Sequence, residues 1–234
     1  MNRMPGAAWL DANARASEAG NPGAKPTGAD PWECVSLVHG FFANPMMMTV
    51  LGHRLDRRGY IAKPWGYWNM RRSILEHAEA FSHELARLDA DRAVGTIHLV
   101  THSMGGIIAR AALERFRPQK LGRFVMLAPP NHGSFVATAT VGVLGGLFKP
   151  VAELTTAPDS LVNSLGMPTG IDVGVIAASR DALVSPESTR PDVPHAHVTI
   201  ACLHSSLLFR RDAADLVAAF LATGRFPEPE TSRR

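Results

Sequence analysis

The strongest constraint in this sequence is a strand-to-helix turn centred on a serine. An apolar run ends in the segment Thr101-His102-Ser103-Met104, and a helical pattern of apolar residues follows directly. A sharp turn of this kind holds the serine hydroxyl clear of a sheet, and it points the next amide at any negative charge that develops there. Ser103 is therefore the candidate nucleophile, and the Met104 amide is a candidate oxyanion donor.

Small residues are expected beside such a turn, because the strand and the helix pass close to each other there. Gly105 and Gly106 meet this requirement on the helical side. Thr101, two residues before the serine, departs from the Gly-x-Ser-x-Gly pattern, so its branched β-carbon needs room in the fold.

Length and composition favour a single domain. The chain has 234 residues, of which 46% are hydrophobic and 19% are charged, and this is enough to bury one sizeable core. The formal net charge is only +3, and several arginines lie near the two ends of the chain (Arg3, Arg15, Arg225, Arg233 and Arg234). The pI of about 9.2 is therefore weak support for a polyanionic partner, and no basic stripe with interleaved aromatic residues indicates nucleic acid.

No segment of the sequence has the pattern of a membrane span or a metal site. The longest uncharged apolar run, Phe135 to Phe148, is shorter than the roughly 20 residues that a transmembrane helix needs. Residues 1–30 lack the apolar core of a signal peptide, so we expect a cytoplasmic protein if Met1 is the true start. Cys34 and Cys202 are expected to be buried free thiols, and neither a metal nor another cofactor is expected.

The pattern along the chain divides it into three regions. Residues 1–30 are rich in Ala, Gly, Pro and Asn, and they predict a flexible arm with at most a short helix near Ala7 to Ala19. Residues 31–224 carry the alternating apolar segments of a folded domain. Residues 225–234 are expected to form a C-terminal tail.

Within the domain, expected strands alternate with expected helices. Strands are predicted at 33–38, 60–63, 96–100, 121–127, 171–178 and 197–203. Helices are predicted from Pro45 to Gly59, from Ser73 through Leu88, after Ser103, and from Leu208 through Phe220, whereas residues 135–165 are expected to be irregular and apolar. This alternation indicates an α/β fold, a three-layer sandwich in which a mostly parallel sheet of about six strands carries helices on both faces.

Three polar residues that suit one reaction come directly after strands of this sheet. Ser103, Asp181 and His204 each lie just beyond the carboxyl end of a predicted strand. In a parallel sheet these ends meet at one edge, where the residues that do chemistry gather. We therefore expect the three side chains to lie together.

Other residues remain alternatives for the acid and the base of this set. Asp159 and Glu187 are the reserve candidates for the acid. His195 and His197 compete with His204 for the role of the base, although their alternation is more typical of one face of an edge strand.

The chain order Ser, Asp, His, together with the turn at Ser103 and the loop His39-Gly40, resembles that of the α/β-hydrolases of the lipase/esterase group. Within that superfamily the sequence is most similar to small bacterial lipases with little or no lid. In those lipases His-Ser-Met-Gly-Gly recurs without a glycine two residues before the serine. Three further segments resemble theirs: APPNHGS at 128–134, SRDALV at 179–184 and HSSLL at 204–208.

The resemblance implies a role for each candidate residue. Ser103 attacks an ester carbonyl, His204 transfers the proton, and Asp181 orients the imidazole. The amides of Phe41 and Met104 form the oxyanion hole, and His39 is the structural histidine of that loop. Substrate is expected to contact four further side chains, with plain aromatic packing as the alternative for the tryptophans: Phe42, Trp65, Trp68 and His132.

The function expected from this resemblance is hydrolysis of carboxylic esters, with a small-molecule or lipid ester as substrate. A serine nucleophile argues against the haloalkane dehalogenases and epoxide hydrolases of the fold, which use aspartate. An acyltransferase, thioesterase or amidase with the same triad stays open, and so does a catalytically silent binding protein. The oligomeric state and transient contact with a lipid surface also stay open.

The run from Phe135 to Phe148 has two interpretations. It lies where larger relatives insert a cap, and it is too short for an elaborate one. It is either a small apolar flap beside an open acyl site, which favours esters of short to medium chain length, or a buried helix.

Overall fold

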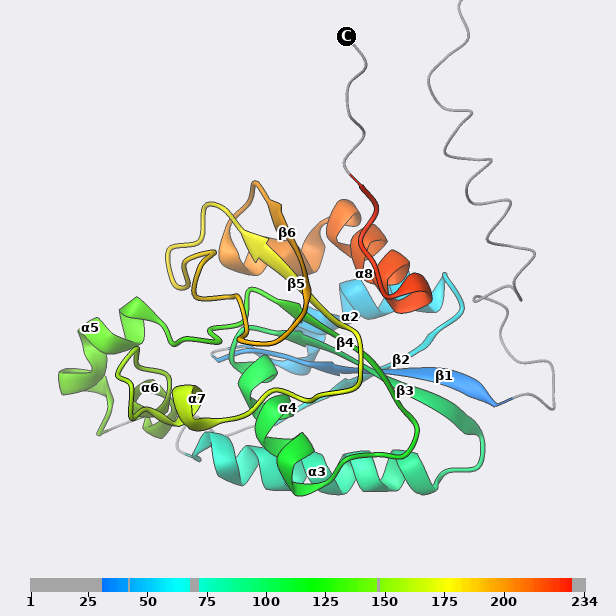
Figure 1. Ribbon diagram of the computed structural model, residues 1–234, viewed down its shortest axis with the longest axis horizontal. Coiled ribbons are helices and arrows are strands. Elements are labelled where there is room, and N and C mark those ends of the chain that lie inside the picture. Colours follow the sequence, from blue (N-terminus) through cyan, green and yellow to red (C-terminus); the bar gives the residue numbers. More distant parts are fainter. Residues whose placement is uncertain (1–30, 42, 68–71, 147, 229–234) are drawn as a thin grey trace, which may run out of the picture.

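The computed structural model describes residues 31–41, 43–67, 72–146 and 148–228 (Figure 1). The predictions of a flexible arm at 1–30 and of a short helix near Ala7 to Ala19 lie outside the described residues. So do the expected substrate contacts Phe42 and Trp68 and the end of the chain from 229 onward. The described part of the C-terminal segment stays in contact with the domain, because Phe226 packs against Phe220 with ring centroids 4.9 Å apart.

The centre of the fold is one sheet of six parallel strands. In spatial order the strands are β2 (Ile61–Trp65), β1 (Trp32–Val38), β3 (Val94–His102), β4 (Leu121–Leu127), β5 (Val173–Ala178) and β6 (Ala196–Ile200). Every neighbouring pair is parallel. The predicted parallel sheet of about six strands is confirmed, and the carboxyl ends of its strands meet at one edge.

Helices cover both faces of the sheet, as Figure 1 shows. On one face α3 (Ile74–Ala90) and α4 (Met104–Arg115) pack on the first of two hydrophobic clusters. On the other face α2 (Pro45–Asp56) and α8 (Arg211–Thr223) pack on the second cluster. The three-layer sandwich is confirmed, and each layer boundary is a continuous apolar core.

The amphipathic pattern predicted for α3 is confirmed in detail. Its N-terminus is a capping box, in which the Ser73 hydroxyl accepts from the Glu76 amide and the Glu76 carboxylate accepts from the Ser73 amide. The predicted apolar stripe is fully buried against the sheet: Ile74, Ala78, Phe81, Leu85 and Leu88. Capping and periodicity therefore agree on where this helix begins and which face it buries.

Several strand boundaries differ from the prediction by a few residues, and two of these differences lie beside Ser103 and His204. β3 continues to His102, so that it delivers Ser103 directly at its end. β6 ends at Ile200, before the predicted end at 203, because the Cys202 amide turns back to the Ile200 carbonyl at 2.9 Å. His204 therefore begins a 3-10 helix, η1 (His204–Phe209), instead of following the strand directly.

The segment expected to be irregular contains three short helices. They are α5 (Phe135–Leu144), α6 (Lys149–Glu153) and α7 (Leu161–Ser164). The Ser134 hydroxyl caps α5, and Pro150 lies in the first turn of α6. The buried-helix interpretation of this run is wrong, since Ala137 is the only buried residue among the described residues of α5.

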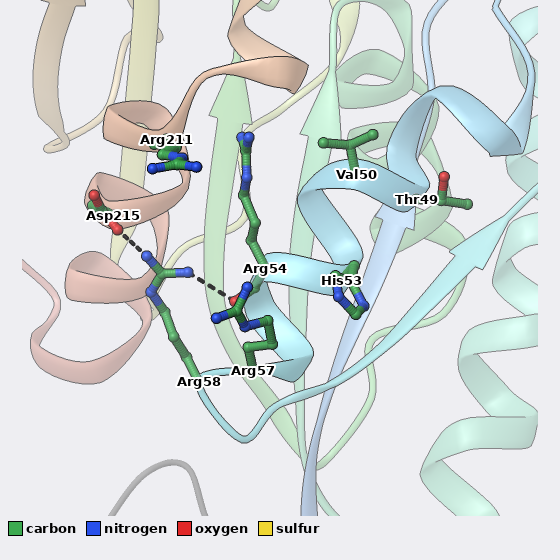
Figure 2. A pocket seen from close by; sticks show the side chains of 8 residues that line it. All are labelled: Thr49, Val50, His53, Arg54, Arg57, Arg58, Arg211 and Asp215. Carbon is green, nitrogen blue, oxygen red and sulfur yellow. Dashed lines mark hydrogen bonds and ion pairs between the residues drawn. The ribbon is translucent and has the colours of Figure 1, made fainter.

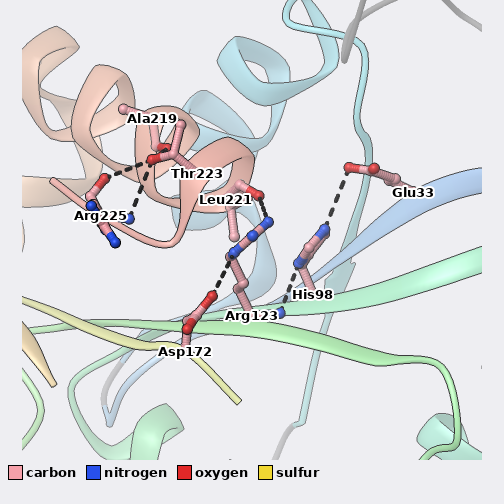
Figure 3. Close-up of polar contacts among 8 residues, drawn as sticks. All are labelled: Glu33, His98, Arg123, Asp172, Ala219, Leu221, Thr223 and Arg225. Atoms are coloured by element: carbon pink, nitrogen blue, oxygen red, sulfur yellow. Dashed lines mark hydrogen bonds and ion pairs between the residues drawn. The ribbon is translucent and has the colours of Figure 1, made fainter. Parts of the chain in front are cut away.

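A polar network ties the amino-terminal side of the sheet to α8 (Figure 3). The Arg123 guanidinium donates to the Leu221 carbonyl at the end of α8, at 2.6 Å, and to the Asp172 carboxylate, at 3.0 Å. His98 Nδ1 accepts from the Arg123 amide at 2.9 Å, and its Nε2 lies 3.4 Å from the Glu33 carboxylate. This contact with His98 holds the pKa of Glu33 below its usual value. The network therefore fixes the end of α8 on strands β1, β3 and β4.

Replacing Arg123 should loosen α8 without disturbing the core. We expect Arg123→Met to lower the free energy of unfolding by about 1–2 kcal/mol, because the Leu221 carbonyl and Asp172 lose a charged donor while the aliphatic stem is kept. Urea denaturation measures this change. Arg115→Met, at an exposed position near the end of α4, should stay within about 0.5 kcal/mol of wild type. Equal effects of the two substitutions would contradict the role assigned to Arg123.

Candidate active site

Ser103 occupies a strained turn between β3 and α4. Its backbone has φ 53° and ψ −129°, a region that L residues rarely adopt and that costs about 1–3 kcal/mol. The Ser103 amide donates to the Leu127 carbonyl at 2.8 Å, and the Ser103 carbonyl accepts from the Gly106 amide at 2.9 Å. The surrounding chain therefore holds the residue in this conformation, with its side chain half-buried at the end of the strand.

Two glycines allow the chain to pack closely around this turn. A Cβ on Gly105 would lie 2.5 Å from the Val38 carbonyl oxygen and 2.6 Å from that of His39. A Cβ on Gly40 would lie 2.8 Å from the Ser103 Cβ. Helix α4 and the loop after β1 are thus in direct contact with each other and with Ser103, and any side chain at these positions would separate them.

The side chain of Thr101 lies beside Gly106, where the missing glycine side chain leaves space for it. The threonine is completely buried in β3, and its Oγ1 would lie 3.3 Å from a Cβ on Gly106. The same Cβ would lie 3.4 Å from the Met126 sulfur and from Pro129. The glycine after the turn therefore compensates for the missing glycine before it.

Asp181 and His204 form a direct polar contact at this edge of the sheet. His204 Nδ1 lies 2.5 Å from Asp181 Oδ2, and the aspartate side chain is fully buried. The other carboxylate oxygen of Asp181 accepts from the amides of Leu183 and Val184, at 2.8 and 3.0 Å. The acid is therefore fixed by its own loop, and it holds the imidazole with Nε2 directed away from the carboxylate.

His102 links the serine turn to the histidine loop. It directly precedes Ser103, and its ring packs against the His204 ring with centroids 4.8 Å apart. Its Nε2 lies 3.4 Å from the His204 carbonyl oxygen. Burial lowers the pKa of His102 to about 3, so the ring is neutral at physiological pH. Sequence analysis did not assign a role to this residue, although it lies within the motif that singled out Ser103.

The loop after β1 is held by aromatic stacking. The His39 ring stacks on Tyr67 at 4.2 Å, and the Tyr67 hydroxyl donates to the His39 carbonyl at 2.9 Å. Burial lowers the pKa of His39, which keeps the ring neutral. Phe41 follows in this loop with its ring against Phe148, and Met104 provides the first amide of α4, which has no carbonyl of the helix to pair with. Both expected oxyanion donors thus lie on segments that contact the Ser103 turn.

The loop after β4 anchors the acid loop. The Ser134 hydroxyl donates to the Leu183 carbonyl at 2.7 Å, and Asn131 donates to the Thr189 carbonyl at 2.8 Å. Ser188 donates in the opposite direction, to the Gly133 carbonyl at 2.6 Å. The segment APPNHGS, singled out only by resemblance, therefore has a physical role in placing Asp181.

A buried arginine on α4 holds three segments together. Arg110 donates to the Asn131 side chain at 3.2 Å, to the Val162 carbonyl at 3.2 Å and to the Leu165 carbonyl. Burial lowers the pKa of this guanidinium to about 10. The signal for this role in the sequence is a charged residue inside the apolar run GGIIARAAL.

The remaining candidate residues have other contacts. Trp65 packs against Phe81 with ring centroids 4.7 Å apart, which agrees with the packing alternative but does not test contact with substrate. His132 lies 3.5 Å from the Asp192 carboxylate on the surface. His197 Nε2 lies 3.0 Å from the Thr189 hydroxyl. Asp181, and neither reserve carboxylate, is the acid in contact with His204.

The described residues also bear on metal-binding groups, membrane-spanning helices and disulfide bonds. Within them no group of three or more His, Cys, Asp or Glu is placed to hold a metal ion. No helix there is both long and apolar enough to cross a membrane. Cys34 and Cys202 are buried and free, as predicted.

Comparison with known proteins identifies relatives by fold. No protein-family model matches the sequence, and no curated protein is significantly similar to it. The propeptide form of lipase BlEst2 from Bacillus licheniformis superimposes with a TM-score of 0.69 at 17% identity, over 86% of this chain and 52% of that one. The mature form of the same lipase superimposes with a TM-score of 0.64 at 16% identity, over 86% of this chain and 94% of that one. Phospholipase PlaB from Legionella pneumophila superimposes with a TM-score of 0.63 at 15% identity, over 82% of this chain and 59% of that one. The chain thus spans about half the length of the propeptide form, and the likeness concerns the fold.

The close approach of α4 to β1 can be tested at Gly105. We expect Gly105→Ala to lower the free energy of unfolding by about 3 kcal/mol, because the added methyl group meets two carbonyl oxygens of the backbone. Gly142→Ala on α5 is the matched control, since its new methyl group would meet no atom within 4 Å. It should leave stability unchanged or raise it by up to about 1 kcal/mol. Chemical denaturation of both variants decides, and a Gly105 variant as stable as the control would contradict the packing described.

Proposed function

We propose that this chain, which has the α/β-hydrolase fold of the lipases, is a serine hydrolase that cleaves carboxylic esters. The observation that carries the proposal is the strained backbone of Ser103. Backbone strain of about 1–3 kcal/mol is found most often at functional sites. Here it presents a hydroxyl next to His102, whose ring contacts His204.

In the first half of the proposed reaction Ser103 takes up the acyl group. The Ser103 oxygen forms a bond to the ester carbonyl carbon while His204 Nε2 takes the hydroxyl proton. Asp181 supports this role, because its contact with Nδ1 keeps the proton there and leaves Nε2 as the base. The tetrahedral intermediate then expels the alkoxide, which leaves as the alcohol with the proton from His204.

The charge of the tetrahedral intermediate needs donors. The amides of Phe41 and Met104 are proposed to hold the oxyanion, and the N-terminus of α4 adds positive potential. Loss of one such donor typically costs ~2.7–4 kcal/mol of transition-state stabilisation. The contact of the Gly40 loop with Ser103 therefore matters for rate as well as for packing.

In the second half water releases the acid. His204 takes a proton from water, whose oxygen forms a bond to the acyl carbon. The second tetrahedral intermediate collapses, the bond to Ser103 breaks, and His204 returns the proton to the serine oxygen. The enzyme regains its initial state with no cofactor in the scheme.

Exposed apolar side chains support an apolar substrate. Leu183 lies two residues after Asp181, and Leu203 directly precedes His204, with 42% and 62% of their surfaces exposed. Phe135 is 50% exposed at the start of α5. Such side chains on the loops of the triad suit an acyl chain that rests on an open surface, so we propose esters of short to medium chain length.

The nucleophile is tested with a series of p-nitrophenyl esters from acetate to palmitate. Ser103→Ala should lower kcat/KM by about a thousandfold or more, because the acyl-enzyme cannot form. Ser164→Ala, an exposed serine on α7, is the matched control and should keep full activity. Hydrolysis by the Ser103 variant at the wild-type rate would refute the proposal.

The same series measures the acyl site. With every ester kept below its critical micelle concentration, we expect kcat/KM to peak at a short or medium acyl chain. The reason is that the proposed flap, α5, is small and most of its surface is open to solvent. Comparing acetate with palmitate as monomers gives the answer. Equal turnover of the two would contradict an acyl site of limited length.

A further inference from the structure

A strongly basic pocket lies between α2 and α8, on the face of the sheet opposite α3 and α4 (Figure 2). It has a volume of about 820 Å³, which is within the range of small-molecule sites. It is lined by residues of both helices and by Arg57 and Arg58, which directly follow α2: Thr49, Val50, His53, Arg54, Arg57, Arg58, Arg211 and Asp215. Val50 is the only aliphatic side chain in this set, so the pocket suits a polar ligand.

The positive charge of the pocket is not balanced by its own acid. Four arginines line it with a single carboxylate, that of Asp215. Arg58 pairs with this carboxylate and also donates to the Arg54 carbonyl at 2.8 Å. Arg54 donates to the Phe209 carbonyl at 2.8 Å. Neither the Arg57 nor the Arg211 guanidinium group has a hydrogen bond or an ion pair within the part of the chain that the structure describes.

Nearby carboxylates are engaged elsewhere. Asp56, the last residue of α2, lies between Arg54 and Arg57 in sequence. Its carboxylate accepts from the Ala62 amide at 2.9 Å and so fixes the turn into β2. Asp212, next to Arg211, pairs with Arg210. Neither of these carboxylates forms an ion pair with an arginine of the pocket among the described residues.

The clustering of these cations has an energetic cost. Burial lowers the pKa of Arg58, and the neighbouring charges of Arg54 and Arg57 lower it further. Like charges that converge on one hollow without counter-charges repel one another, and a bound anion relieves this repulsion. The arrangement therefore favours the binding of an anion.

Phosphate is the anion that best matches the donors. A guanidinium group pairs with phosphate through two parallel hydrogen bonds, and its planar shape favours such pairing over contact with monatomic anions. Two arginines satisfy the exposed oxygens of one phosphate, and Arg57 and Arg211 are the two whose guanidinium groups have no partner among the described residues. We propose that this pocket binds a ligand carrying a phosphate group, either free in solution or as the headgroup of a lipid.

Calorimetric titration of the full chain with tripolyphosphate tests the site. The double variant Arg57→Gln/Arg211→Gln should bind at least about tenfold more weakly than wild type, because it removes the two guanidinium groups that have no partner. Both positions are exposed, so the variant should keep the thermal stability and ester hydrolysis of wild type. Binding is read directly and does not depend on catalysis.

The matched control removes the same charge elsewhere. Arg92→Gln/Arg115→Gln lies at exposed positions outside the pocket and should bind tripolyphosphate within about twofold of wild type. Equal weakening in both double variants would overturn the proposal, because attraction would then follow net charge alone. Absence of saturable binding by wild type, to tripolyphosphate and to vesicles alike, would also overturn it.

Vesicles distinguish the two sources of phosphate. Phosphatidylcholine vesicles with and without a phosphoinositide are compared in sedimentation with the same variants. Retention on phosphoinositide vesicles that is lost in Arg57→Gln/Arg211→Gln supports a lipid headgroup. Binding of tripolyphosphate without retention on vesicles supports a soluble ligand at the same site.

Discussion

The strained turn at Ser103 is the constraint on which the rest of the site depends. Its backbone conformation is held by hydrogen bonds to β4 and to the first turn of α4. Because Gly105 has no side chain, α4 approaches the carbonyls at the end of β1, and the loop that carries Phe41 lies against the serine. One close contact thus fixes the nucleophile, the start of the helix and the loop with the second oxyanion donor.

Much of the fold follows from local pattern in the sequence. The parallel sheet and the faces of α3 were predicted because their apolar periodicity and capping agree with the tertiary packing. The pairing of Asp181 with His204 was accessible for a related reason. Parallel strands bring their carboxyl ends together, so two polar residues placed after different strands meet across the sheet.

Other features depend on contacts between distant segments, which local pattern does not encode. β6 ends early because Cys202 turns its amide back to Ile200, and nothing in the apolar run HVTIACL marks that turn. The roles of Arg110 and Asn131 arise from segments far apart in the chain. The basic pocket is missed for the same reason, since Arg211 joins Arg54, Arg57 and Arg58 only when α8 packs beside α2.

The most direct test of the account is covalent labelling with a fluorophosphonate, followed by intact mass measurement and peptide mapping. We expect a single adduct on the peptide that contains Ser103, and labelling should be at least about a thousandfold slower in His204→Ala, because the serine loses its base. Circular dichroism confirms that the variant is folded. A folded wild-type protein that takes up no label, or takes it up at another serine, would contradict the assignment of Ser103 as the nucleophile.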